Sequence, residues 1–452
     1  MYDKRIVTSE ASRDLVTAEI DDEQISKPGE APRLTVAVVG SGPSGCYVSQ
    51  FLAKKWPNVD ITVLESLPTP YGLVRYGVAA DHQGAKTVIR QFDRLFSRSG
   101  VRFAGNITVG KDVEFDALAD AFDVVVLATG LPGDRTLDID QYPEVQVLGA
   151  GALLRSLNGY PVALLPRDDN GRYRSLGRSL AVVGMGNVAI DVARLMAKSV
   201  EALAGSDIDD AVLEQLRPSR MDTINIISRS GPSDAKCDIA MLRELIELPD
   251  VGIGVTGIDD QDAGPVVDLL RPFVSGPTTP AALGASKPTH LNLHFRQTPA
   301  SVSSNGETTV LRTTASERGA ELGDILVDSV IAAIGFINGG PETQGHPSAG
   351  WSGDNVYRVG WLRRGPQGTI PENRRDAQQV ADTIIADLVQ GRLTTGSPGF
   401  TAIAPLLRGQ VVDYQDWQRI ESIERRHAPN DRCRRKISDL DQMLAIAVSR
   451  ET

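Results

Sequence analysis

The chain has little cysteine and no long apolar run. Its three cysteines, Cys46, Cys237 and Cys433, are far apart among 452 residues, which excludes a CxxC redox pair, closely spaced zinc ligands and a disulfide framework. No stretch approaches the roughly 20 apolar residues of a membrane span. The net charge of −11 argues against a nucleic-acid-binding surface. We therefore expect a cytoplasmic protein without a metal site, a membrane anchor or a nucleic-acid partner.

The length of the chain exceeds that of one ordinary domain. With 41% hydrophobic residues, two or three domains can each bury a core. Residues 1–33 differ from the rest, because they are rich in acids, almost free of aromatic residues and end in the segment Lys27–Pro32. This composition predicts a flexible N-terminal extension. The sequence leaves the oligomeric state open, and we expect a monomer.

Two segments have the pattern of a βαβ nucleotide-binding unit. In "LTVAVVGSGPSGCYVSQFLAKKW", from Leu34, a β-branched apolar run precedes a glycine turn and a helical pattern, and "DITVLE" follows as a second strand. The stretch "SLAVVGMGNVAIDVARLMA", from Ser179, repeats this order before "TINIISRS". We predict an α/β fold with two doubly wound Rossmann-like nucleotide-binding domains.

The first glycine turn, "GSGPSG", has the spacing of a dinucleotide site. Gly40 permits the tight turn, Gly42 lets the backbone approach a pyrophosphate, and Gly45 allows close packing of helix against strand. Pro43 opens the helix whose N-terminus faces the anion. Glu65 ends the next strand, where a carboxylate can accept hydrogen bonds from a ribose.

The second turn, "GMGNVA", contains Gly184, Gly186 and, at the third position, Ala189. Asn187 and Val188 open its helix. Two dinucleotide sites in one chain suggest electron transfer between two bound cofactors, and flavin with nicotinamide is the natural pair.

The end of the following strand bears on the choice of nicotinamide cofactor. A site selective for NAD carries Asp or Glu there, whereas the 2′-phosphate of NADP calls for a guanidinium. The stretch "SRSG" provides Arg229, flanked by Ser228 and Ser230, and no acid. An ordinary surface arginine is the alternative, and the missing carboxylate favours NADP.

The chain resembles the adrenodoxin-reductase-type ferredoxin-NADP reductases from about Leu34 to near its C-terminus. Four stretches carry the resemblance: "VGSGPSG", "PTPYGLVRYGVAADH", "GNVAIDVAR" and "GWLRRGPQGTI". It implies an FAD-binding domain of residues 34–130 and 335–452, interrupted by an NADP-binding domain of residues 131–334. The strand ends at Gly130 and Gly335 agree with these boundaries.

The resemblance also implies contacts with the cofactors. It places Gly72 and Leu73 beside the flavin and Trp361 next to the isoalloxazine. The backbone of Gly368, Thr369 and Ile370 would meet the flavin and the nicotinamide, as helix N-terminal amides can.

Further residues take their expected roles from the same resemblance. His82 matches the active-site histidine and Glu244 the glutamate that pairs with it, and together they could hold a charge beside the nicotinamide. Asn187 and Asp191 match polar residues on the NADP side.

One departure from the family pattern concerns the phosphate site. Where the family has two adjacent arginines, this chain has Arg229 followed by Ser230. Loss of one bidentate contact removes roughly 1.5–3 kcal/mol of charged hydrogen bonding. We therefore expect a weaker preference for NADPH over NADH than is usual in the family.

The expected reaction carries a hydride from NADPH to FAD, and then single electrons from FAD to a ferredoxin-like iron-sulfur protein. Such a partner is typically acidic, and two basic groups could meet it: Arg363, Arg364, Arg374 and Arg375; and Arg425, Arg426, Arg434, Arg435 and Lys436.

Three alternatives remain open. Disulfide reductases share the two dinucleotide units, but their catalytic cysteines are absent here. Small subunits of glutamate synthase combine FAD with NADPH, but their N-terminal cluster cysteines are missing, because no cysteine precedes Cys46. A non-catalytic nucleotide-binding subunit is the third.

Overall fold

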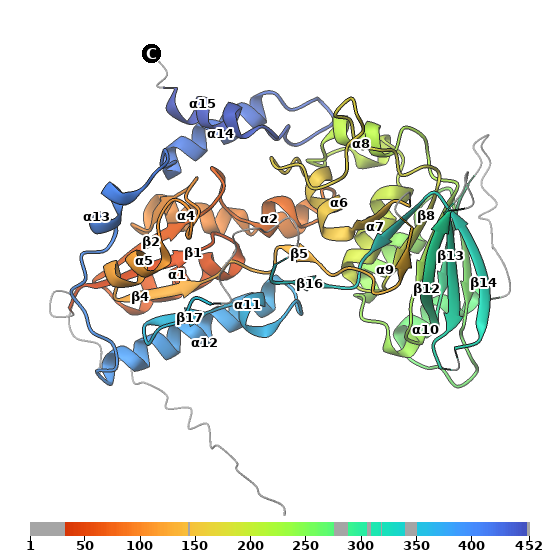
Figure 1. The fold of residues 1–452 in the computed structure, drawn as a ribbon, viewed down its shortest axis with the longest axis horizontal. Coiled ribbons are helices and arrows are strands. Elements are labelled where there is room, and N and C mark those ends of the chain that lie inside the picture. The colour runs from red at the N-terminus through yellow and green to blue at the C-terminus, as the bar shows by residue number, and fades with distance from the viewer. Residues whose placement is uncertain are drawn as a thin grey trace, which may run out of the picture.

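The computed structural model describes residues 32–142, 145–274, 288–304, 309–317, 319–339 and 350–449. The extension predicted for residues 1–33 lies outside these ranges, apart from its last two residues. The described chain forms two lobes joined by a narrow pair of strands (Figure 1). None of its helices is long and apolar enough to cross a membrane.

The first lobe is built on a five-stranded sheet in which every strand pair is parallel. The strands lie in the order β17 (Val356–Arg358), β4 (Val124–Leu127), β1 (Leu34–Val39), β2 (Val59–Leu64) and β3 (Arg102–Ala104). All six residues of β1 are buried. A central parallel strand is covered on both faces, which explains its continuous apolar sequence.

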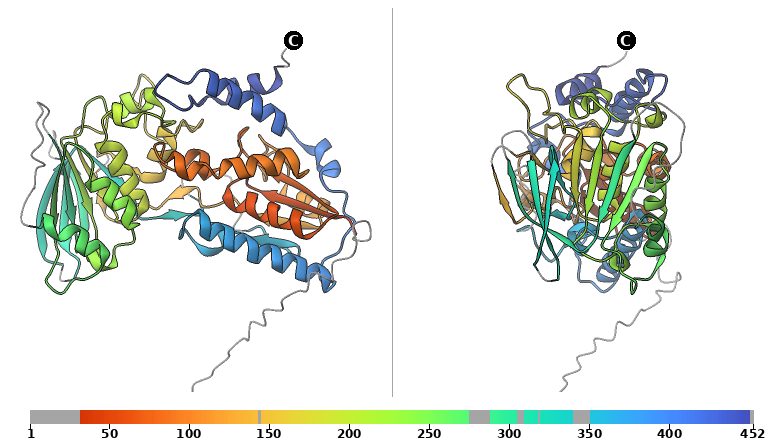
Figure 2. Two further views of the ribbon diagram at one scale, coloured as in Figure 1. Left: turned by 180° about the vertical axis from the view of Figure 1, so that it is seen from behind. Right: turned by 90° about the vertical axis from the view of Figure 1, so that its right-hand side faces the viewer.

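Different helices cover the two faces of this sheet. Val36 and Val38 face a core that includes residues of α1 (Pro43–Lys55), α4 (Ile89–Arg98), α12 (Ile370–Val389), α14 (Tyr414–Arg426) and α15 (Leu440–Val448). Ala37 and Val39 face the opposite way, toward α5 (Phe115–Ala121) and α13 (Phe400–Ile403). Figure 2 shows α12 running along the same lobe as α1.

The second lobe contains a six-stranded sheet that is also wholly parallel. Its strands lie in the order β10 (Val251–Thr256), β11 (Thr289–His294), β9 (Thr223–Ile227), β8 (Ser179–Val183), β15 (Ser329–Ala332) and β7 (Val147–Gly149). The helices that pack on one face are α6 (Ala150–Leu157), α7 (Asn187–Ala197), α8 (Asp210–Leu216), α9 (Ile239–Ile246) and α10 (Pro265–Leu270). Two parallel α/β sheets confirm the predicted fold class.

The other face of this second sheet is covered by strands rather than helices. A four-stranded sheet, in the order β14 (Glu321–Val327), β13 (Thr309–Ala315), β12 (Gln297–Ser304) and β6 (Asp140–Gln141), packs against it (Figure 2). Val302, Leu311 and Val327 point inward and meet Ala181 and Val183 of β8. Along β13 the buried residues Thr309, Leu311 and Thr313 alternate with half-buried or exposed ones, as in a sheet with one solvated face.

Two short antiparallel strands connect the lobes, β5 (Gly133–Asp134) and β16 (Phe336–Ile337) (Figure 1). The first sheet takes its strands from residues on both sides of the second lobe, since β4 ends at Leu127 and β17 begins at Val356. The C-terminal segment also reaches the second lobe, where Arg432 pairs with Asp210 at 2.8 Å. The exact domain limits, 130 and 335, stay a prediction.

Candidate functional site: two glycine turns and the residues between them

The first glycine turn follows β1, at the carboxyl end of the first sheet. Gly40 has φ of +107°, which a side chain rarely adopts, and a Cβ there would lie 2.5 Å from the carbonyl oxygen of Ala128. A Cβ on Gly45 would clash with the carbonyl of Gly40. A Cβ on Gly42, by contrast, would meet no atom within 4 Å. Pro43 occupies the first turn of α1, so the turn leaves open space in front of a helix N-terminus.

Glu65 lies beside this turn and holds its backbone. One carboxylate oxygen accepts hydrogen bonds from the amide and hydroxyl of Ser41, at 3.0 and 2.6 Å. The other accepts from Ser66 and from the amide of Leu67, at 3.1 and 3.2 Å. The carboxylate thus fixes the loop around the expected cofactor, and its contact with a ribose stays a prediction.

The loop at Gly72 and Leu73 packs directly on the first turn. Gly72 has φ of +47°, and a Cβ there would lie 3.0 Å from the Cα of Gly42. Leu73 then begins the short helix α2 (Leu73–Tyr76). Only glycine allows two backbone segments to come this close, so the two predicted flavin-binding segments are adjacent in the structure.

The second glycine turn has the same construction at the carboxyl end of β8. Gly184 has φ of +127° and lies against the carbonyl of Ala333, whereas a Cβ on Gly186 would meet no atom within 4 Å. Asn187 begins α7 and accepts a hydrogen bond from the amide of Asp238 at 2.7 Å. Behind it Ala189 is fully buried and Val188 is half-buried.

Residues after β9 form the predicted phosphate site. Arg229 is exposed, and its side chain makes no ion pair within the described ranges. Ser230 is half-buried, and its carbonyl accepts a hydrogen bond from the amide of Arg296 at 3.3 Å. The guanidinium of Arg296 also lies 2.9 Å from the position of a Cβ on Gly231. A second arginine therefore reaches this turn from a distant part of the chain.

The charge of Arg296 is already neutralised. Its two terminal nitrogens donate to the carboxylate of Asp262 at 2.9 and 2.7 Å, and one donates to the carbonyl of Gly257 at 2.6 Å. These hydrogen bonds from Arg296 lower the pKa of Asp262 to about 2. Arg229 is consequently the guanidinium at this turn that has no acidic partner among the described residues.

Trp361 connects the two glycine turns. Its ring stacks on Phe336 with centroids 5.3 Å apart, and Phe336 is three residues beyond Ala333, which touches the second turn. On the other side, Gly360 has φ of +71° and lies against Ser44 of the first turn. The indole Nε1 of Trp361 is buried without a hydrogen-bond partner among the described residues. One short run of contacts thus joins both turns through this aromatic pair.

The segment after Trp361 ends in the N-terminus of α12. Gly368 has φ of +86°, Thr369 is the N-cap, and Ile370 is the first helical residue. Glu372 accepts a hydrogen bond from the amide of Thr369 at 2.7 Å in a capping box. This bond engages one of the amides that the resemblance assigns to the cofactors. The amide of Ile370, at the first helical position, has no partner within the helix.

His82 lies between two carboxylates at the junction of the lobes. Its Nε2 is 3.3 Å from Glu244 on α9, and its Nδ1 is 3.4 Å from Asp191 on α7. The contact of His82 with Glu244 is the pairing that the resemblance implied. Whether these residues act in catalysis stays a prediction.

Three charged residues near His82 were not predicted from the sequence: Asp81, Arg194 and Lys198. Fully buried Arg194 contacts Asp81 at 2.7 Å and Asp191 at 2.8 Å, and Lys198 contacts Asp81 at 2.7 Å. Arg194 is three residues after Asp191 on α7, a spacing that places both on one helix face and could have identified it.

This cluster shifts the pKa of each carboxyl. Burial would raise the pKa of Asp81, but hydrogen bonds from Arg194 and Lys198 hold it well below its usual range. Burial raises the pKa of Asp191 despite the charge of Arg194. For Glu244, partial burial is outweighed by Arg194 and by the hydrogen bond with His82, which lower its pKa. The three carboxylates Asp81, Asp191 and Glu244 thus share two cations, Arg194 and Lys198, in this cluster.

The two turns have the features that dinucleotides require. Both present a helix N-terminus, and both leave open space at the middle glycine, Gly42 or Gly186. The unpartnered Nε1 of Trp361 adds a buried donor next to the path between them. The residues present therefore fit one dinucleotide at each turn.

The chain is similar to known proteins in sequence and in structure. Residues 34–221 match the family model described as pyridine nucleotide-disulphide oxidoreductase. The chain is similar to cindoxin reductase of Citrobacter braakii, at 40% identity over 92% of each chain. It is 30% identical to the mitochondrial NADPH:adrenodoxin oxidoreductase of Salvelinus fontinalis, over 93% of this chain and 92% of that one.

A solved structure gives the same result. The structure of Mycobacterium tuberculosis FprA in complex with NADPH is similar at a TM-score of 0.77 and 29% identity, over 92% of this chain and all of that one. The sequence-based resemblance is therefore confirmed. The chain belongs to the family of adrenodoxin-reductase-type ferredoxin-NADP reductases.

Proposed function

We propose that the chain is an FAD-dependent enzyme that oxidises NADPH and reduces an iron-sulfur protein. The observation that carries this proposal is the run of contacts from one open glycine turn to the other through Phe336 and Trp361. Two dinucleotides bound at these turns would have their reactive ends near one aromatic pair. Hydride transfer requires such alignment of donor and acceptor.

Each turn would hold a different cofactor. FAD would bind at the turn of Gly40, Gly42, Pro43 and Gly45, and NADP at the turn that begins with Gly184. When bound, the flavin supplies the redox chemistry, because it accepts two electrons as a hydride and can release them singly. The chain positions and shields the reacting groups, so the proposal requires no nucleophile.

Residues between the turns would orient the nicotinamide. His82, held by Glu244 and Asp191 at 3.3 and 3.4 Å, presents a ring of fixed orientation at the junction of the lobes. Arg229 would bind the 2′-phosphate of NADP. The FAD-binding domain would comprise residues 34–130 and 335–452, and the NADP-binding domain residues 131–334.

The electron acceptor would be a small iron-sulfur protein, and the chain would act as a monomer. Relatives are named for the reduction of cindoxin, adrenodoxin and ferredoxin. An acidic partner could bind to exposed arginines, among them Arg374, Arg375 and Arg426. Lys436 and Arg434 cannot contribute to that surface as expected, because Lys436 is 8% exposed and Arg434 is paired with Glu421 and Glu424.

Cofactor content and reduction test this proposal. The purified chain should carry one FAD, and anaerobic NADPH should bleach its flavin absorbance. Oxidised ferredoxin should then restore the absorbance in two one-electron equivalents. A purified chain without flavin, and unable to take up FAD, would instead favour a non-catalytic nucleotide-binding subunit.

A further inference from the structure

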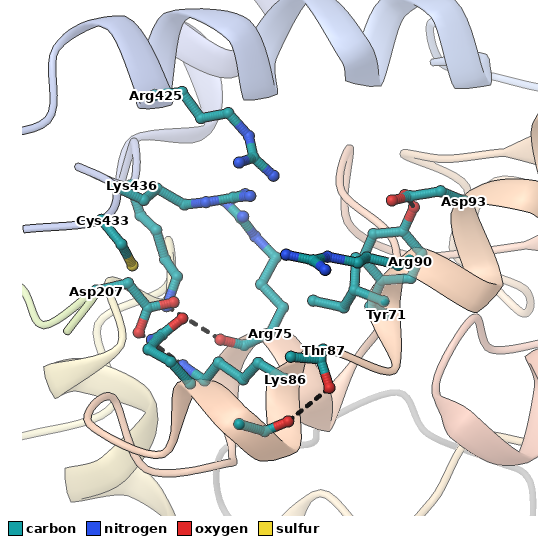
Figure 3. A pocket seen from close by; sticks show the side chains of 14 residues that line it. Tyr71, Arg75, Lys86, Thr87, Arg90, Asp93, Asp207, Arg425, Cys433 and Lys436 are labelled. Atoms are coloured by element: carbon teal, nitrogen blue, oxygen red, sulfur yellow. Dashed lines mark hydrogen bonds and ion pairs between the residues drawn. The ribbon is translucent and has the colours of Figure 1, made fainter. Parts of the chain in front are cut away.

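A cavity lined by basic side chains lies next to Tyr71, the residue before the loop at Gly72 and Leu73. It encloses about 420 Å³ between α2, α3 (Gln83–Lys86), α4, α14 and the segment that carries Cys433 and Lys436. Figure 3 shows the side chains of Arg75, Arg90 and Arg425 directed into the same space from different elements. Neither Gly42 nor Gly186 lines this cavity, whereas Tyr71, which precedes Gly72, does.

The charges around the cavity do not balance. Six basic side chains line it, namely Arg75, Lys86, Arg90, Arg425, Arg434 and Lys436. Four carboxylates line it or pair with those side chains, namely Asp93, Asp207, Glu421 and Glu424. Basic groups therefore outnumber acidic ones around the cavity, although the whole chain carries −11.

The deepest cation has hydrogen-bonding capacity to spare. Arg75 is 2% exposed, and its Nη2 donates to Glu424 at 2.5 Å. The rings of Tyr76 and Trp417 lie 4.9 and 4.8 Å from the guanidinium carbon. Its Nε and Nη1 have no hydrogen-bond partner among the described residues. A buried donor without a partner costs free energy, which an anion in the cavity would recover.

Two lysines that line the cavity, Lys86 and Lys436, lie close to each other and are buried. Lys86 and Lys436 share one carboxylate, Asp207, at 2.7 and 2.9 Å. Burial lowers the pKa of Lys436 well below its usual value, and the neighbouring charge of Lys86 adds to this effect. An additional negative charge at this wall would relieve the repulsion between the two ammonium groups.

We propose that this cavity is a binding site for a phosphate group, either free or carried by a small metabolite. A phosphate anion complements this excess of basic groups, and its oxygens accept hydrogen bonds from several guanidinium groups at once. Arg75 would provide the buried donors, and Arg90 and Arg425, both exposed, would close on the anion from the mouth. The volume falls in the usual range of small-molecule sites and exceeds what phosphate alone needs, so a phosphate monoester fits as well.

Calorimetric titration of the FAD-loaded protein, with NADP⁺ saturating, tests this site. The probes are inorganic phosphate and glycerol 3-phosphate, at ionic strength held constant with chloride. We expect saturable binding at one site per chain. Equal affinity for both probes identifies free phosphate as sufficient, and tighter binding of the ester identifies a metabolite as the ligand.

Matched variants separate this site from general electrostatic attraction. The double variant Arg90→Gln/Arg425→Gln should weaken binding by at least about tenfold, since it removes two charge-assisted contacts. Arg94→Gln/Arg426→Gln removes the same charge from exposed positions on the same helices, outside the cavity lining, and should change affinity less than about twofold. Arg229→Gln should have no effect.

Three outcomes would overturn the proposal. The first is no saturable binding of either probe up to about 10 mM, well above the weakest affinity expected for such a site. The second is an equal loss of affinity in both double variants. The third is loss of binding in Arg229→Gln, which would place the anion at the NADP site instead.

Discussion

Replacement of Arg229 by glutamine should remove most of the preference for NADPH over NADH. Arg229 is exposed at the turn after β9 and has no ion-pair partner in the described part of the chain, whereas the nearby Arg296 donates to Asp262 at 2.9 and 2.7 Å. A 2′-phosphate at this turn therefore has one guanidinium free to bind it.

The size of the effect follows from that single contact. A charged hydrogen-bonding contact contributes about 1.5–3 kcal/mol, so kcat/KM with NADPH should fall roughly 10- to 150-fold. The value with NADH should stay within about twofold, because NADH has no phosphate there. Steady-state reduction of an artificial acceptor with each nucleotide measures both numbers. Arg312→Gln, at an exposed residue of β13 that is paired with Asp324, is the matched control and should change neither.

One result would refute this reasoning directly. If the NADPH preference survives in Arg229→Gln and collapses in Arg296→Gln, the distant arginine binds the phosphate and must leave Asp262 when NADPH binds. An unchanged preference in both variants would remove this turn from nucleotide selection altogether.

Four further predictions concern the site and its support. Gly42→Ala should lower FAD content without lowering the thermal stability of the FAD-free protein, because the new Cβ meets only open space in the protein; Gly84→Ala, at an equally open position, should keep full FAD content, and equal losses in both would contradict the placement of FAD. His82→Gln should retain FAD but slow flavin bleaching by NADPH by about tenfold or more, the effect of one charged contact; unchanged stopped-flow kinetics would exclude it from the site. Arg194→Met should reduce the free energy of unfolding by about 3–5 kcal/mol, because it removes the ion pairs of Arg194 with the buried Asp81 and Asp191; urea unfolding measures this, with little change expected for Arg312→Met. Burial would raise the pKa of Asp207, but Lys436 and Lys86 lower it to about 2; its stabilisation is therefore complete above about pH 4 and is lost as pH falls through about 2, and acid unfolding of Asp207→Asn should lack this component.

The glycine turns could be predicted from sequence because their signals are local. Strand, turn and helix follow one another within about 20 residues, and the positive φ of Gly40 and Gly184 is a property of the turn itself. The parallel sheets follow from the same alternation of strands and helices. The four-stranded sheet that covers one face of the parallel sheet in the second lobe was not predicted.

The polar contacts of the site depend on residues far apart in the chain. His82 and Glu244 are separated by 162 positions, so only the family resemblance paired them. Arg296 reaches the turn at Gly231 from the loop after β11, and no local pattern indicates that approach. The basic cavity could not be predicted from the sequence for the same reason. Lys436, which was expected to meet a partner protein, is buried against Asp207, more than 200 positions away in the chain.

The central claim is that electrons pass from NADPH through a bound flavin to an iron-sulfur protein. Anaerobic stopped-flow mixing of the FAD-loaded chain with NADPH, followed by a second mixing with oxidised ferredoxin, tests it most directly. We expect NADPH to bleach the flavin absorbance in the first step. In the second step the flavin should be reoxidised one electron at a time while the iron-sulfur cluster of ferredoxin is reduced. A flavin that NADPH does not bleach, or that stays reduced while ferredoxin stays oxidised, would contradict it.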